Sequence, residues 1–317
     1  MEAIKNKKIL VTGGAGFLGS YVSEYLCKNN EVTVLDNLSS GSAKNIEHIK
    51  SRIKFVQQDI SKQFITNEKY DIIFHMASLA SPKFYQKFPI NTLDANVFGT
   101  KQMLELAKKN NAIFFFTSTS EVYGNAQVVP TPENYYGYVN SFGPRSCYDE
   151  SKRCAEAYIY SFIQQEKVDA RIVRIFNTYG ERMSNEDGRV IPNFINQVLD
   201  KKPITIYGKG SQTRSYCYVS DLIEGFMKIL SSKKEKVCGE IFNLGNPEEY
   251  TVLELAEKIK KMMNSNSKII FEPLPKDDPV RRKPDISKAK KILDWEPKIN
   301  LETGLKKTIE YFEKVNS

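Results

Sequence analysis

The most constraining feature of this sequence is a glycine-rich turn near the N-terminus, between a short apolar run and a helical pattern. The segment Val11–Gly19 reads Val-Thr-Gly-Gly-Ala-Gly-Phe-Leu-Gly and follows the apolar residues within 8–12. The spaced glycines Gly13, Gly16 and Gly19 suit a tight turn, close approach of the backbone to a phosphate, and close packing of helix on strand. Because the N-terminus of the following helix offers free N–H groups, the turn predicts a dinucleotide site.

An acidic residue stands where a dinucleotide site needs one. Asp36 comes seventeen residues after Gly19, at the end of the strand expected over 31–35. A carboxylate there can bind the adenosine ribose hydroxyls and would repel a 2′-phosphate, which favours NAD over NADP. Asp59, at the end of the next strand, can bind the adenine amino group or only cap its strand. A glycine turn without a ligand would not explain the acid after the second strand.

Short apolar runs alternate with helical patterns in the first half of the chain, which favours βαβ units and a parallel sheet. Strands are expected over 8–12, 31–35, 53–56, 71–74, 112–116 and 170–175, and helices over 17–28, 91–110 and 147–166. After Asn177, short strands over 204–207 and 240–244 are mixed with helices over 190–200, 220–230, 251–263 and 301–314.

This pattern predicts an α/β protein with two parts. Residues 1–176 are expected to form a Rossmann-like, doubly wound parallel sheet that binds NAD. Residues 177–317 are expected to form a smaller mixed α/β lobe that binds the substrate, with some segments returning to the first domain.

The composition is that of a globular protein without an evident metal or disulfide framework. Apolar residues make up 41% of the chain, and no run of about 18 apolar residues is present to span a membrane. Five cysteines without a C-x-x-C pair, and only two histidines, favour a reducing cytoplasm and no bound metal. The net charge of +8 comes from scattered lysines, which favours a solvated surface over a nucleic-acid site.

A tyrosine and a lysine lie four residues apart in the helix expected over 147–166. This spacing places Tyr148 and Lys152 on one face of the helix, about one turn apart. A lysine ammonium beside a phenol lowers the tyrosine pKa from its usual value near 10. Such a tyrosine can take a proton from a sugar hydroxyl while hydride leaves the same carbon. Because this spacing is common on helix surfaces, its meaning depends on the other motifs.

Taken together, these motifs resemble the extended short-chain dehydrogenase/reductase family, also called the NAD-dependent epimerase/dehydratases, whose members act on nucleotide sugars. Beside the glycine turn and the Tyr148/Lys152 pair, the chain carries Thr-Ser-Thr-Ser-Glu-Val-Tyr-Gly at 117–124. The UDP-glucuronate decarboxylase (UDP-xylose synthase) branch is the most similar. The strings shared with that branch are GPRSCYDESKR at 143–153, NTYGERM at 177–183, DGRV at 187–190, GSQTR at 210–214, YVSDL at 218–222, NLGNPEE at 243–249 and DDPVRRKPDI at 277–286.

The resemblance implies a decarboxylation in which NAD is held tightly and recycled in each turnover. Tyr148 takes the proton of the sugar 4-hydroxyl, Lys152 lowers the tyrosine pKa and binds the nicotinamide ribose, and Ser120 hydrogen-bonds the same oxygen. Hydride moves from C4 to NAD, and the resulting β-keto acid loses carbon dioxide before the hydride returns to give UDP-xylose. Arg282 reads the C6 carboxylate with its planar fork, and Glu121 manages protons or water near C5.

The resemblance also assigns residues to the two ligands. The expected NAD contacts are Gly13, Gly16, Phe17, Leu18, Gly19, Asp36, Asn37, Asp59, Ile60, Ala77, Asn96, Tyr148 and Lys152. The expected substrate contacts are Asn177 at the diphosphate, Arg189 and Arg214 at the phosphates or ribose, Tyr207 and Gln212 at the uridine, and Arg282 at the carboxylate. Relatives dimerise through a four-helix bundle, so the helices over 91–110 and 147–166 predict a homodimer.

The sequence departs from the branch at four places. Ser40-Gly41-Ser42 replaces Thr-Gly-Arg, so an expected cofactor-phosphate arginine is missing and Lys44 is a candidate substitute. Leu79 and Glu181 replace prolines, and Asp94 replaces a lysine. If that lysine approaches the sugar acid, the change at Asp94 leaves specificity for glucuronate open.

Three alternative functions remain open. A nucleotide-sugar 4-epimerase or 4-oxidoreductase would use the same Tyr/Lys chemistry, although Glu121 and Arg282 favour the decarboxylase. A 4,6-dehydratase would carry an Asp-Glu pair after the threonine, where this chain has Ser120. A non-catalytic NAD-binding scaffold would need neither Tyr148 nor Lys152.

Overall fold

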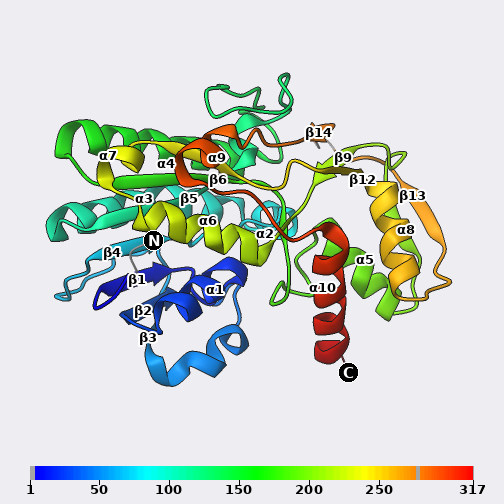
Figure 1. Cartoon of the computed structure of the whole chain (residues 1–317), viewed down its shortest axis with the longest axis horizontal. Helices are drawn as coiled ribbons and strands as arrows, with labels where there is room; N and C mark the ends of the chain where they lie inside the picture. The colour runs from blue at the N-terminus through cyan, green and yellow to red at the C-terminus, as the bar shows by residue number, and fades with distance from the viewer. Residues whose placement is uncertain (1–3, 276–278, 317) are drawn as a thin grey trace.

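A seven-stranded parallel sheet dominates the structure, a computed structural model that describes residues 4–275 and 279–316 (Figure 1). In sheet order the strands are β11 (Ile241–Leu244), β6 (Ala170–Ile175), β5 (Ile113–Thr119), β4 (Ile72–His75), β1 (Lys8–Thr12), β2 (Glu31–Asp36) and β3 (Ile53–Gln57). The order reverses beside β1, with β2 on one side and β4 on the other. In such sheets ligands bind at the carboxyl ends of the strands beside the reversal.

Successive residues of the central strands face opposite sides of the sheet and enter two separate cores. Ile9 and Phe115 pack in one core, whereas Leu10 and Phe114 pack in the other. All four side chains are completely buried. Strands that are buried on both faces are what a parallel sheet between two layers of helices requires.

Helices cover both faces of this sheet (Figure 1). The helices that share the second core are α3 (Pro89–Asn110) and α4 (Ser146–Glu166). The helices that share the first core are α1 (Phe17–Leu26) and α6 (Val219–Ser231). The predicted α/β fold class, with a doubly wound parallel sheet, is therefore confirmed.

A smaller lobe of mixed structure lies beside the sheet (Figure 1). Its strands are β8 (Ile204–Tyr207) paired with β13 (Ile269–Glu272), and β9 (Thr213–Ser215) between β12 (Glu249–Thr251) and β14 (Arg281–Arg282). Its helices are α5 (Val190–Leu199), α8 (Val252–Met262) and α10 (Leu301–Asn316). Between the two parts, β7 (Thr178–Tyr179) pairs with β10 (Cys217–Tyr218).

Several elements were not expected from the sequence. Most of them are too short to show periodicity, and the one over Ala43–Arg52 is a 3₁₀ helix of ten residues, whose period differs from that of an α-helix. They are η1 (Ala43–Arg52) and η2 (Ser120–Tyr123), both 3₁₀ helices, and α2 (Pro82–Lys87), α7 (Lys234–Val237) and α9 (Ser287–Leu293). Three of them, η1, α2 and η2, border the candidate site. Over the ranges that the structure describes, no helix combines the length and the apolar character needed to cross a bilayer.

Candidate active site

A cavity of about 1010 Å³ extends from the glycine turn to β14 in the smaller lobe. It is large enough for a dinucleotide and a second ligand, since drug-sized ligands occupy pockets of about 300–1,000 Å³. Every residue predicted to bind a ligand or to take part in catalysis lines this cavity, except Asn96. Asn96 is buried between α3 and α4, where its Nδ2 donates to Ser151 Oγ at 2.9 Å. Asn96 therefore does not line the cavity in this structure, and its contact with the cofactor stays a prediction.

The glycine turn leaves room that side chains would fill. Gly13 has φ of +71°, and a Cβ there would lie 2.8 Å from the backbone of Ala77. A Cβ on Gly19 would collide with the carbonyl oxygen of Gly13. Gly16 caps α1 without a side-chain hydrogen bond, so the first N–H groups of the helix are available to an anion. These features fit the pyrophosphate of a dinucleotide.

Asp36 ends β2 at the same edge of the sheet. Its Oδ2 accepts from Ala15 N–H at 3.0 Å and its Oδ1 from Leu38 N–H at 2.8 Å. Burial raises the pKa of Asp36, and these backbone donors oppose that rise. The hydrogen bonds hold the carboxylate at the cavity wall, which fits a ribose with free hydroxyls. Asp59 lines the cavity too, and its Oδ1 also accepts from Ser61 N–H at 2.8 Å, so both of its predicted roles remain compatible with the structure.

Tyr148 and Lys152 both face the cavity from α4, and both are buried. The Tyr148 ring stacks on Tyr85 of α2, with 5.2 Å between ring centroids and 5° between planes. Lys152 Nζ donates to the carbonyl oxygen of Thr117 at 2.9 Å and lies 4.7 Å from the centroid of Phe116. Burial lowers the pKa of Lys152 to about 7.

The predicted lowering of the tyrosine pKa by the lysine is wrong for the protein alone. Burial raises the pKa of Tyr148 above its usual value, and a hydrogen bond with Thr119 opposes that rise. Glu121 raises it further, whereas Arg189 lowers it. The sequence spacing puts Tyr148 and Lys152 on one face but does not show that the lysine amine turns to the Thr117 carbonyl.

Glu121, in η2, is held by two arginines from different parts of the chain. Its Oε1 accepts from Arg282 Nη1, and its Oε2 accepts from Arg282 Nη2 at 2.7 Å and from Arg145 Nη2. Burial raises the pKa of Glu121, but Arg282 and Arg145 outweigh burial and lower it to about 2. Ser120 is buried beside Glu121 and also lines the cavity.

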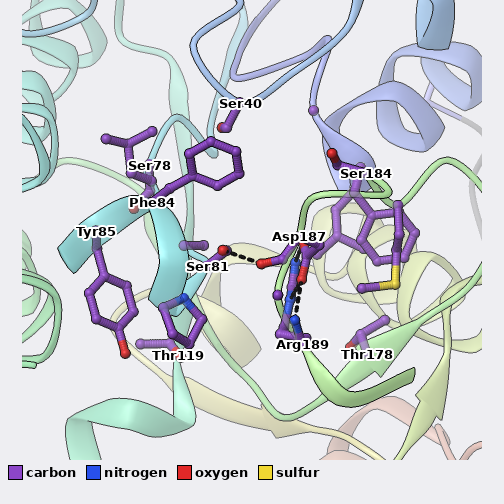
Figure 2. Close-up of a pocket in the computed structure, with 18 of the residues that line it drawn as sticks. Ser40, Ser78, Ser81, Phe84, Tyr85, Thr119, Thr178, Ser184, Asp187 and Arg189 are labelled. Atoms are coloured by element: carbon purple, nitrogen blue, oxygen red, sulfur yellow. Dashed lines mark hydrogen bonds and ion pairs between the residues drawn. The ribbon is translucent and has the colours of Figure 1, made fainter. Parts of the chain in front are cut away.

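A third arginine, Arg189, enters the cavity from the loop before α5. It forms an ion pair with Asp187, whose carbonyl oxygen accepts a hydrogen bond from Ser81 Oγ at the start of α2 (Figure 2). The contact between Ser81 and Asp187 links the sheet to the smaller lobe. Arg189 is thereby held in place while its guanidinium remains on the cavity wall.

The remaining predicted substrate residues line the end of the cavity within the smaller lobe. Arg214 is buried in β9, and its Nη1 donates to Thr213 O at 2.9 Å. Gln212 Nε2 donates to Tyr207 O at 2.7 Å, and the Tyr207 side chain is 46% exposed. Asn177 also lines the cavity, and it lies between β7 and β6, a strand of the seven-stranded sheet.

Sequence reasoning missed four side chains that shape the site. Tyr85 and Ser81 lie in or beside α2, where no periodic signal marks them. Arg145 and Asp149 stand within the string at 143–153, so that motif was the available signal. Asp149 Oδ2 lies 3.6 Å from Arg145 Nε, behind the cavity wall.

The departures from the branch differ in their distance from the site. Leu79 and Lys44 line the cavity, whereas Asp94 does not. Glu181 accepts a hydrogen bond from Tyr218 at 2.7 Å and does not line the cavity. Asp277 and Asp278 of the string at 277–286 lie outside the described residues. Among the residues that the structure describes, no three His, Cys, Asp or Glu side chains are grouped to hold a metal ion.

One cavity is thus lined by the glycine turn, by Asp36 at the expected ribose site, and by the pair Tyr148 and Lys152. A family model described as the NAD dependent epimerase/dehydratase family matches residues 9–245. The chain belongs to this family. Its membership confirms the resemblance seen in the sequence, and the cofactor named in the family description is the one that the glycine turn and Asp36 fit.

Within the epimerase/dehydratase family, curated relatives are similar over nearly the whole chain. UDP-glucuronic acid decarboxylase 1 of Danio rerio is 48% identical, over 97% of this chain and 73% of its own length. UDP-glucuronic acid decarboxylase 3 of Arabidopsis thaliana is 45% identical, over 95% of this chain and 87% of its own length.

Solved structures of epimerases share the fold at lower identity. UDP-glucose 4-epimerase of Thermotoga maritima, with UDP-glucose, has a TM-score of 0.90 and 31% identity, covering 98% of this chain and 100% of that one. UDP-glucuronic acid 4-epimerase of Bacillus cereus, in complex with UDP-glucuronic acid and NAD, has a TM-score of 0.87 and 28% identity, covering 97% and 99%.

Proposed function

We propose that this protein is an NAD-dependent lyase that converts UDP-glucuronate to UDP-xylose and carbon dioxide, with NAD recycled in each turnover. The observation that carries the proposal is the Glu121–Arg282 pair, which lies on the same cavity as Tyr148. A fork-shaped guanidinium at that place suits recognition of a carboxylate. The similarity to UDP-glucuronic acid decarboxylases supports the same substrate.

The residues at the carboxyl ends of β1 and β2 suit NAD. The glycine turn accepts the pyrophosphate, Asp36 the adenosine ribose, and Asn37, Asp59 and Ile60 line the part of the cavity beyond it. When bound, NAD supplies a hydride acceptor for C4 of the sugar, later returns the hydride, and adds a positive charge to the site. A positive charge near a phenol lowers its pKa, which opposes the effect of burial on Tyr148.

The protein side chains handle the protons of the reaction. Tyr148 takes the proton of the 4-hydroxyl and returns it at the end, while Ser120 hydrogen-bonds the same oxygen. Lys152 orients the cofactor ribose from the neighbouring turn of α4. Oxidation at C4 makes the sugar a β-keto acid, so the C5–C6 bond can break with its electron pair passing into the C4 carbonyl. C5 then gains one proton, and Glu121 manages that transfer.

The smaller lobe supplies the residues for the nucleotide part of the substrate. Arg189, Arg214 and Asn177 suit the diphosphate, because guanidinium groups bind phosphate oxygens in pairs. Tyr207 and Gln212 lie at the outer end of the cavity and suit the uridine. This division supports residues 1–176 as the NAD-binding domain and 177–317 as mainly the nucleotide-sugar lobe, with β11 returning to the sheet.

A nucleotide-sugar 4-epimerase is the second candidate. A solved UDP-glucuronic acid 4-epimerase has nearly the same fold, so a site of this type can also accept a uronic acid without losing carbon dioxide. A 4-oxidoreductase would use the same pair, Tyr148 and Lys152, for hydride transfer. The presence of both Glu121 and Arg282 on the cavity favours the decarboxylase.

The protein is further proposed to be a cytoplasmic homodimer. α3 and α4 pack along each other, and each leaves an apolar side chain exposed, Phe98 at 58% and Tyr160 at 66%. Two such pairs would form a four-helix bundle. All five cysteines are free, which suits a reducing compartment.

The direct test supplies the protein and NAD with UDP-glucuronate and follows the products by mass spectrometry. The expected products are carbon dioxide and a UDP-pentose identical to UDP-xylose. A UDP-uronic acid with its carbon count intact would instead identify the epimerase. Release of a 4-keto sugar with NADH would identify the oxidoreductase.

A further inference from the structure

Asp149 is a buried carboxylate for which the proposed reaction has no role. It follows Tyr148 in the first turn of α4, is 5% exposed and does not line the cavity. Its Oδ2 lies 3.6 Å from Arg145 Nε. Its Oδ1 is buried and has no hydrogen-bond partner in the ranges 4–275 and 279–316. A carboxylate in this setting is poorly stabilised as an anion.

Arg145 connects this carboxylate to the site. Its guanidinium contacts Asp149 on one side and Glu121 on the other, and Arg282 binds Glu121 as well. The cluster therefore holds two guanidinium groups and two carboxylates, which balance when both acids are ionised. The charge of Arg214 also lowers the pKa of Glu121, but the proposed function assigns that arginine to the substrate phosphates. All four side chains are at most 14% exposed, so solvent screens their charges little.

Among the described groups that shift the pKa of Asp149, the cations are Arg145 and Arg282. None of the others is a cation that could balance another anion. Those groups are Glu121 from η2, Arg145 from the segment before α4, and Arg282 from β14. Tyr85 of α2 stacks on Tyr148, and Cys147 precedes Tyr148 on α4 itself. On α3, Asn96 donates a hydrogen bond to Ser151, which lies two residues after Asp149 on α4. Asp94 lies two residues before Asn96.

A carboxylate substrate would disturb this balance. If Arg282 reads the C6 carboxylate of UDP-glucuronate, three carboxylates share two guanidinium groups in a buried site. A buried charge without a partner is costly, and such a group takes up a proton instead. The two acids differ in how readily they take up a proton. Burial raises the pKa of Glu121, but the arginines outweigh it and lower that pKa to about 2. Burial, and after it the charge of Glu121, raise the pKa of Asp149 to about 7.

We propose that Asp149 is a positioning residue that takes up a proton when a sugar carboxylate binds, so that Arg145 and Arg282 can hold Glu121 and the substrate together. The inference rests on the proposed function, because it needs a substrate with a carboxylate at C6. When the C5–C6 bond breaks, the negative charge passes with the electron pair to the C4 oxygen and neutral carbon dioxide departs. The cluster then has no third carboxylate, and Asp149 returns its proton to solvent before the next substrate binds. Asp149 thereby favours uronic acids over neutral sugars at this site.

Isothermal titration calorimetry tests this by counting the protons taken up on binding. The Tyr148→Phe variant with NAD bound prevents turnover, and titration at pH 8 in buffers of different ionisation enthalpy gives the proton number. UDP-glucuronate is expected to bring roughly 0.5–1 proton, and UDP-glucose, which carries a hydroxymethyl group instead, about none. Equal proton uptake for the two sugars would overturn the inference.

A second variant assigns the proton to its residue. In Tyr148→Phe/Asp149→Asn, the uptake with UDP-glucuronate should fall to the UDP-glucose level. The affinities for the two sugars should then change with pH in the same way between 6 and 8.5, roughly the range in which a carboxylate with a pKa near 7 titrates. Tyr148→Phe/Asp149→Glu should restore the uptake. Uptake that persists in the Asn variant contradicts the assignment, and if that variant does not fold, the comparison of the two sugars still decides.

The outcome is separable from that of the proposed function. Carbon dioxide release by the unmodified protein, without proton uptake on binding, would overturn only the role of Asp149. Proton uptake specific to UDP-glucuronate, without carbon dioxide release, would support the role of Asp149 and refute the decarboxylase.

Discussion

Adjacent residues in this protein can have very different environments, as Arg281 and Arg282 show. Arg282 is buried at the cavity and grips Glu121, whereas Arg281 is half exposed and pairs with Glu249 on the surface. Both belong to the two-residue strand β14, and successive side chains of a strand point to opposite sides. The strand therefore delivers one arginine to the site and the other to solvent.

A pair of lysine substitutions tests this difference. Arg282→Lys keeps the charge but loses the two-pronged contact, so kcat/KM for UDP-glucuronate should fall about 10–100-fold, the equivalent of roughly 1.5–3 kcal/mol for a charged hydrogen bond. The matched Arg281→Lys should change it less than about twofold, because exposed ion pairs contribute little. Steady-state kinetics with both variants decides; equal losses would place the carboxylate elsewhere.

The buried ammonium of Lys152 predicts an unusual dependence of stability on pH. Its pKa is lowered to about 7 in the folded protein by burial, against about 10.4 in an unfolded chain. The unfolded state therefore binds more protons between these values, and the cost of burying the charge is complete below pH 7 and fades as the pH rises towards 10.

Replacing Lys152 by Met should remove that cost. At pH 6, without NAD, the variant should unfold at a temperature higher by at least about 1.5 °C, the shift that roughly 1 kcal/mol produces when unfolding gains about 2.1 cal/mol/K per residue. The gain should shrink at pH 9.5. Lys101→Met, at an exposed position of α3, is the control and should show no such trend. Differential scanning fluorimetry across pH measures both; a gain independent of pH would contradict the explanation.

At the scale of elements, long periodic segments were predictable from the sequence and short ones were not. α3 and α4 begin within two residues of their expected starts, because their apolar spacing continues over several turns. η2, α2 and β14 carry Glu121, Tyr85 and Arg282 respectively, and each is too short for a pattern. Glu121 and Arg282 were assigned by motif, whereas Tyr85 and Arg145 were recognised as their neighbours only when the structure brought distant segments together.

The paired helices α3 and α4 carry the prediction about assembly. Phe98→Glu places a charge on an exposed apolar position of α3, where a dimer of usual interface size, about 1,200–2,000 Å², would have to exclude water. The variant should be a monomer by light scattering coupled to gel filtration. Phe271→Glu, equally exposed on β13 of the smaller lobe, should leave the assembly unchanged. Monomeric unmodified protein would contradict the bundle.

At the scale of the whole molecule, the larger of the two main apolar cores extends across both predicted parts. The cluster that contains Ile9 of β1 and Phe115 of β5 continues through α6 to Phe194 of α5. Phe226 of α6 lies 5.5 Å from Phe115, measured between ring centroids, so α6 covers a face of the sheet although it belongs to the second half of the chain. The predicted boundary at residue 176 therefore does not divide this core.

Two measurements follow from the shared core. Calorimetric unfolding of the full chain should show one cooperative transition, because neither part is packed independently. A fragment of residues 1–176 lacks α6 and β11, so it should bind hydrophobic dyes strongly and aggregate, whereas a fragment extended to residue 245 should do so less. Two resolved transitions, or a soluble and compact 1–176 fragment, would contradict this.

The pairing of Glu121 with Arg282 also has a consequence for biosynthesis. The two residues are 161 positions apart in the chain. At about 5–20 residues per second, a ribosome needs roughly 10–30 s to add the arginine after the glutamate. During that interval a nascent chain already carries the complete glycine turn and Tyr148 but lacks one of the cations that hold Glu121. The ability to recognise a sugar acid is thus acquired late in translation, after the parts that suit NAD.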